Sequence, residues 1–109
     1  MISKELLSAV LDRGIRECHL TRNHPYKYLE FETDIRTKNA INIYELQHLI
    51  KAWIVKQDYD LEINYDEETV YIDLCKGEVL ITSALSYNLK DETQAICVIG
   101  EWILKEISK

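Results

Sequence analysis

Three cysteines and three histidines are the residues of this 109-residue chain that most directly suggest catalysis. A cysteine nucleophile needs a nearby histidine to accept its proton. Cys18 with His24, and Cys97 with His48, are conceivable pairs of this kind. The competing interpretation is that Cys97 is a small core residue and that the histidines lie at turns or helix flanks. We predict no catalytic residue and no enzyme, and keep a small-ligand-binding protein or enzyme using Cys18 and His24 as the alternative.

The spacing of the same residues also argues against a metal or cofactor site. A zinc site normally uses paired ligands at short spacing, such as Cys-x-x-Cys, whereas Cys18, Cys75 and Cys97 are far apart. Cys18 and His19 are adjacent, so on a strand they point to opposite faces. The three glycines stand alone, which excludes a phosphate-binding loop and a dinucleotide fingerprint. The sequence therefore predicts neither a metal nor a cofactor.

Acidic side chains are concentrated in one region. From Asp58 to Glu78 there are eight acids and a single base, Lys76. One interpretation is a solvated hairpin turn next to a strand face exposed to water. The other is a surface that binds a basic partner or mimics nucleic acid. The candidate protein-binding surface consists of Asp58, Asp60, Glu62, Asp66, Glu67, Glu68, Tyr71 and Asp73.

The charge and composition of the whole chain limit its partners and location. A net charge of −6 opposes binding to phosphate backbones, so we do not expect direct nucleic-acid binding. No apolar run approaches the roughly 20 residues that span a bilayer, so we expect no membrane partner. An odd number of widely spaced cysteines is typical of reduced cytosolic thiols. We therefore expect a cytoplasmic protein.

Apolar periodicity predicts three helices. Ser3 is the expected N-cap of the first helix and Gly14 its C-cap. Asn42 is expected to cap a second helix that ends near Gln57, and the last helix is expected from about Asp91 to Ile107. The apolar arc of the last helix is unusually wide. Either it is buried between the sheet and a neighbouring helix, or it contacts a second copy in a two-fold dimer.

Alternating apolar and polar residues predict the strands. Residues 15–20 and 26–33 are expected to form a hairpin around Asn23-His24-Pro25, and residues 34–41 a loop. A meander is expected over 61–65, 70–75 and 78–84. These elements predict one α+β domain over residues 1–109 in the order α-β-β-α-β-β-β-α. We expect a mostly antiparallel sheet of about five strands, packed by helices in a layered sandwich.

Two helical segments carry a resemblance to a known group. Asn42-Ile43-Tyr44-Glu45-Leu46, followed by His48, Lys51, Trp53 and Tyr59, resembles a segment of small uncharacterised phage and prophage proteins. Residues 92–97 and 101–104 resemble the closing helix of the same proteins, which are related to the phage ABA sandwich domain group, and residues 4–8 also fit. These packing motifs cover about a third of the chain. The resemblance implies an α/β sandwich and a phage or prophage source, and it transfers no catalytic residue.

The functional expectation combines these observations. We expect a small, non-enzymatic phage-type accessory protein that binds a protein partner, such as a basic host protein, through its acidic surface. An inhibitor of a host defence system, such as an anti-CRISPR, is one natural form. A second alternative is a self-associating structural protein, a homodimer whose contact uses Cys97, Gly100 and Leu104 of the last helix.

Overall fold

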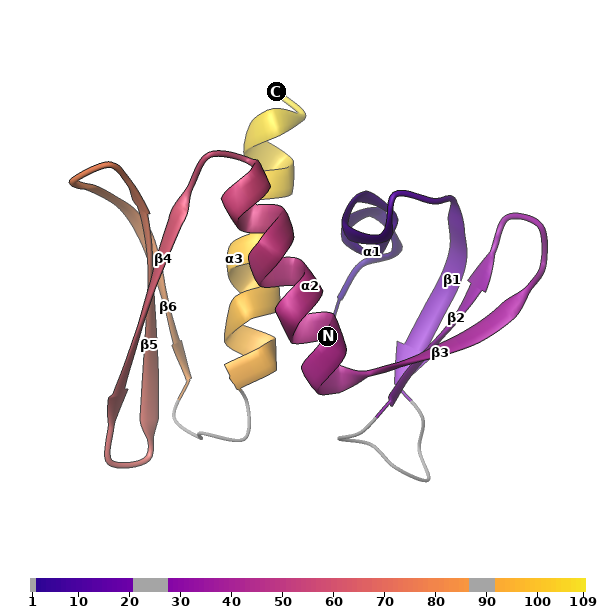
Figure 1. Ribbon diagram of the computed structural model, residues 1–109, viewed down its shortest axis with the longest axis horizontal. Coiled ribbons are helices and arrows are strands. Elements are labelled where there is room, and N and C mark those ends of the chain that lie inside the picture. Colours follow the sequence, from indigo (N-terminus) through magenta and orange to yellow (C-terminus); the bar gives the residue numbers. More distant parts are fainter. Residues whose placement is uncertain (1, 21–27, 87–91) are drawn as a thin grey trace.

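The computed structural model describes residues 2–20, 28–86 and 92–109. The Asn23-His24-Pro25 turn and the helix start at Asp91, both predicted from the sequence, lie outside these ranges. Within these ranges, three helices and six strands follow one another along the chain, and Figure 1 shows their arrangement. They are α1 (Lys4–Leu11), β1 (Ile15–Leu20), β2 (Tyr28–Thr33), β3 (Lys38–Asn42), α2 (Ile43–Lys56), β4 (Asp60–Asp66), β5 (Thr69–Lys76), β6 (Val79–Ser86) and α3 (Glu92–Ile107).

The strands form two antiparallel sheets of three strands each, one in the order β1-β2-β3 and the other in the order β4-β5-β6. Figure 1 shows α2 and α3 between the two sheets, with α1 beside the first sheet. The predicted α+β class is confirmed. The predicted single sheet of about five strands is wrong, and so is the predicted order, because the chain runs α-β-β-β-α-β-β-β-α.

Strand β3 is the element that the sequence did not reveal. It lies in the predicted loop 34–41 and pairs with β2 from Lys38 opposite Glu32 to Asn42 opposite Tyr28. Ile41 is the single large apolar residue of β3 and is buried. The segment therefore lacks the alternation of apolar and polar residues from which a strand is predicted. Asn42 ends β3 in extended conformation and also caps α2, since its side-chain oxygen accepts from the Tyr44 amide at 2.8 Å.

A single layer of helices buries the inner faces of both sheets. The wide apolar arc of α3 is explained by this arrangement, because α3 packs against α2, α1, β5 and β6. Cys97 and Gly100, two of the three residues named for the alternative dimer contact, are buried within the chain, and Leu104 is partly buried. The largest fully buried side chains come from the three helices, from β2 of the first sheet and from β5 of the second: Leu6, Leu7, Leu29, Leu46, Ile50, Ile54, Val70, Ile72, Leu74, Ile96, Ile99 and Ile103.

Of the two caps predicted for α1, the structure confirms the N-cap and not the C-cap. Ser3 is the N-cap as predicted, and its hydroxyl accepts from the Leu6 amide and donates to Glu101 of α3 at 2.7 Å. The predicted C-cap at Gly14 is wrong, because α1 ends earlier and Asp12 adopts the left-handed conformation. Gly14 lies instead beside Asp34: a Cβ atom there would lie 1.8 Å from the Asp34 carboxylate, so a larger residue requires this exposed side chain to move away.

Polar side chains join the second sheet to the helices. The Tyr65 hydroxyl of β4 donates to Glu92 at 2.6 Å, and this hydrogen bond raises the pKa of Tyr65. Glu92 also accepts from the Gln47 amide at 3.0 Å, and Gln47 accepts from the buried Thr93 hydroxyl at 2.6 Å. This connected network satisfies the buried polar groups and fixes the sheet relative to α2 and α3.

Candidate functional site

The acidic residues of β4 and β5 share the outer face of the second sheet, the face turned away from the helices. The two strands pair in regular antiparallel register from Asp60 opposite Cys75 to Asp66 opposite Thr69. In this register Glu62 lies directly opposite Asp73. Residues directly opposite each other point to the same side of a sheet. Two carboxylates therefore stand next to each other on this face.

The inner and outer faces of the second sheet differ sharply in character. Val70, Ile72 and Leu74 point inward and are fully buried, whereas Asp60, Glu62 and Asp66 are exposed on the other side. Tyr71 is 41% exposed on the outer face opposite Asn64. We call the set Asp60, Glu62, Asp66, Tyr71 and Asp73 the acidic face.

Three of the predicted site residues lie outside this face. Asp58 was predicted to belong to the acidic surface, but it precedes β4 in the turn after α2, with a positive φ of 70°. Glu67 and Glu68 form the two-residue turn between β4 and β5, whereas Asp66 is the last residue of β4. The turn therefore extends the acidic face at one end, whereas Asp58 belongs to the connection.

No counter-charge accompanies the acidic face within the part of the chain that the structure describes. The ion pairs found there involve other residues. Lys76, the single base of the region, lies on the inner side of β5 with its ammonium 5.2 Å from the centre of the Tyr59 ring. Asp73 accepts a hydrogen bond from the Ser83 hydroxyl of β6 at 2.7 Å, which orients the carboxylate without neutralising it.

The thiol of Cys75 shares this face and responds to its charge. Partial burial raises its pKa, and the carboxylates of Asp73, Glu62 and Asp60 raise it further. A raised pKa keeps the thiol in its neutral form, which is a poor nucleophile and a poor metal ligand. The face therefore disfavours bound anions and favours cations.

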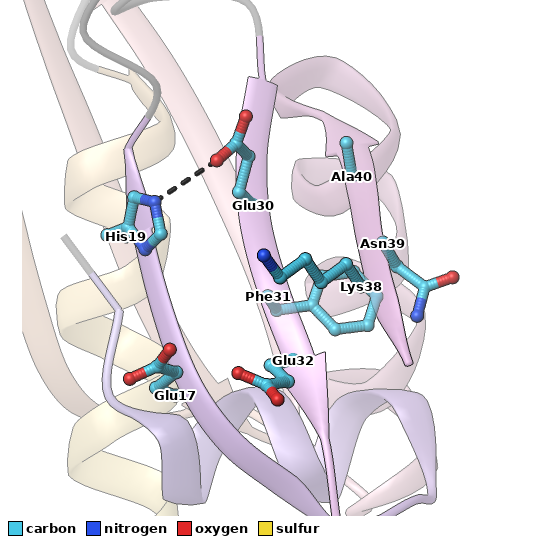
Figure 2. A pocket seen from close by; sticks show the side chains of 8 residues that line it. All are labelled: Glu17, His19, Glu30, Phe31, Glu32, Lys38, Asn39 and Ala40. Carbon is cyan, nitrogen blue, oxygen red and sulfur yellow. Dashed lines mark hydrogen bonds and ion pairs between the residues drawn. The ribbon is translucent and has the colours of Figure 1, made fainter. Parts of the chain in front are cut away.

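The first sheet carries a second group of polar residues, none of which belongs to the site predicted from the sequence. Its outer face has a hollow of about 540 Å³ (Figure 2). His19 lies 3.1 Å from Glu30 there, and Glu17 is opposite Glu32 in register. In the sequence, Glu17 and His19 are two residues apart, as are Glu30 and Glu32, and this spacing places all four side chains on one face of the sheet. This face differs from the acidic face in carrying counter-charges: Arg16 lies 3.7 Å from Glu32, and Lys38 lines the hollow.

The cysteine and histidine pairs considered for catalysis are not brought together among the described residues. Cys18 is half-buried on the inner side of β1, with its Sγ 3.6 Å from the Ile2 carbonyl oxygen, whereas His19 points outward. His24 lies outside the described residues. Cys97 is fully buried and burial raises its pKa to about 12, while His48 is exposed on α2. A thiol in that environment stays protonated at neutral pH.

Two further searches of the described residues gave no site. Residues 2–20, 28–86 and 92–109 contain no group of three or more His, Cys, Asp or Glu side chains arranged to hold a metal ion. Within the same ranges, no helix has the length and apolar character needed to cross a membrane. Comparison with family models, curated proteins and solved structures found no match for this chain.

Proposed function

We propose that this chain is a non-enzymatic accessory protein that binds a basic protein through its acidic face. The observation that carries the proposal is the pair Glu62 and Asp73, directly opposite each other on adjacent strands with no base beside them among the described residues. Like charges in this position destabilise a sheet by about 0.2–1 kcal/mol. A cation from a partner offsets that cost, so the face is better suited to a complex than to the free chain.

Charge and shape support a protein as the partner. Complementary charge accelerates encounter and orients the two surfaces. Tyr71, partly exposed among the carboxylates, supplies a large ring with a polar tip, a residue type that interfaces favour. The resemblance of the α2 and α3 segments to phage proteins supports a phage-encoded source. An inhibitor of a host defence system, directed at a basic host protein, is the form we propose.

The test is affinity capture with two variants that remove the same amount of charge. The first variant carries Asp60→Asn, Glu62→Gln and Asp73→Asn on the acidic face. The matched control carries Glu17→Gln, Glu30→Gln and Glu32→Gln on the outer face of the first sheet. Each variant removes three negative charges from a chain of net charge −6, so general electrostatic attraction weakens equally in both.

We expect a basic protein from host lysate to be retained by the wild type and the control and lost by the acidic-face variant. Binding of the purified partner should also weaken as salt rises, because exposed charges are screened beyond about 8 Å at physiological ionic strength. Equal retention by all three proteins, or equal loss by both variants, would show that the acidic face is not the binding surface.

A further inference from the structure

Strand β6 forms an edge of the second sheet and differs from the other edge strands in charge. Its eight residues, Val79 to Ser86, include no Asp, Glu, Lys, Arg or His. The edge strand β4 carries three acids, β1 carries Arg16, Glu17 and His19, and β3 carries Lys38. Charged side chains are a usual device that prevents edge strands from pairing with another chain. Among the four edge strands of the described residues, β6 is the one without charged side chains.

Three consecutive apolar side chains at the start of β6 are exposed. Val79 and Leu80 are 62% and 58% exposed, and Ile81 beside them is 37% exposed. The register with β5 shifts at this end, and from Thr82 to Ser86 the strand pairs regularly with β5. No other described strand pairs with β6, so a regular run of edge backbone lies next to exposed apolar side chains.

We infer that β6 pairs with β6 of a second copy, joining the two second sheets into one continuous antiparallel sheet. Because β6 carries no charge, antiparallel pairing of Val79–Ser86 with the same residues of a copy sets neutral side chains against neutral ones. A strand from a basic partner would instead place its lysines and arginines against Val79, Leu80 and Ile81. The charge pattern therefore favours a second copy of this chain over the basic partner of the acidic face.

The inference is independent of the proposed function, but the two are compatible. A two-fold axis perpendicular to the sheet keeps both outer faces on the same side. Each copy contributes an acidic face one strand away from the junction, because Asp73 lies on β5 opposite Ser83 of β6. The dimer would present two acidic faces in one surface, with neither face used for the contact between copies.

The test is sedimentation of the full chain from about 1 μM to about 1 mM, a range that covers weak and moderate dimers. We expect a concentration-dependent species of twice 12.8 kDa for the wild type. Leu80→Lys should raise the dissociation constant at least about tenfold, because two-fold symmetry introduces each lysine twice. Ser83→Lys should do the same, and the lysine that it introduces beside Asp73 replaces the Ser83 hydrogen bond with an ion pair that supports folding. The control Ile35→Lys, at a position 83% exposed in the turn between β2 and β3, should leave the dimer unchanged.

Hydrogen exchange locates the contact in the same samples. Amides of β6 should become more protected as concentration rises, and those of β4 should not. A wild type that stays monomeric over the whole range overturns the inference. So do β6 lysine variants that remain dimeric while folded by circular dichroism, and assemblies that grow beyond two copies.

Discussion

The like-charge pair on the acidic face makes a stability prediction that does not require a partner. Replacing Glu62 by Gln removes one of the two opposed carboxylates while keeping the length and shape of the side chain. Cβ atoms of directly opposite residues lie about 4.5–5.5 Å apart, and two unit charges about 6 Å apart in water repel by roughly 0.7 kcal/mol. Screening at physiological salt roughly halves this value. We therefore expect Glu62→Gln to raise the free energy of unfolding by about 0.3–0.4 kcal/mol at physiological salt.

Urea unfolding is the appropriate measurement, because guanidinium chloride is itself a salt and would screen the repulsion. The gain should be largest at about 0.01 M ionic strength and should disappear near 1 M, where the Debye length is about 3 Å. In a double-mutant cycle, adding Asp73→Asn to Glu62→Gln should give little further gain, since the amide still accepts from Ser83.

The first sheet provides a matched comparison. Glu17 lies opposite Glu32 as Glu62 lies opposite Asp73, but Arg16 lies 3.7 Å from Glu32 and offsets the repulsion. Glu17→Gln should therefore stabilise the chain less than Glu62→Gln. A Glu62→Gln protein that is no more stable than the wild type, or whose gain is independent of salt, would refute the argument that this pair is unfavourable in the free chain.

Three further predictions test the core and the turns. Gly100→Ala should lower the free energy of unfolding by about 1 kcal/mol, because a Cβ atom there lies 2.9 Å from buried Leu6 and overpacking outweighs the gain in helix propensity; urea unfolding in a Leu6→Ala background should show the opposite sign. Cys97, with a pKa raised to about 12, stays neutral in the folded chain while the unfolded thiol ionises above about pH 9. From pH 9 to about 12, the free energy of unfolding of the wild type should therefore fall with pH more steeply than that of Cys97→Ala, by about 1.4 kcal/mol for each pH unit. Equal slopes of unfolding free energy against pH in the two proteins would contradict this. Gly77 and Glu67 are the first residues of the turns after β5 and β4, and both have positive φ, 64° and 49°. Because glycine adopts positive φ more easily than other residues, Gly77→Ala should destabilise the chain by about 1 kcal/mol in thermal unfolding, and Glu67→Gly should stabilise it by a similar amount.

Local patterns in the sequence were sufficient for the helices and for most strands. The hydroxyl of Ser3 and the amide of Asn42 cap their helices as predicted, because capping depends only on the neighbouring backbone amides. The alternation of Val70, Ile72 and Leu74 likewise identified the buried face of β5. Strand β3 was missed because pairing with β2, and not its own composition, makes Lys38–Asn42 extended.

The candidate site also has features that the sequence predicts and features that only the fold determines. The sequence alone determined that acids are concentrated between Asp58 and Glu78 and that the glycine and cysteine spacing fits no phosphate loop or zinc site. Only the tertiary structure decided that Glu62 stands opposite Asp73, that Lys76 lies on the other side of the sheet, and that Asp58 leaves the face. Register and the division into two sheets depend on contacts between residues far apart in the chain, and local periodicity does not encode them.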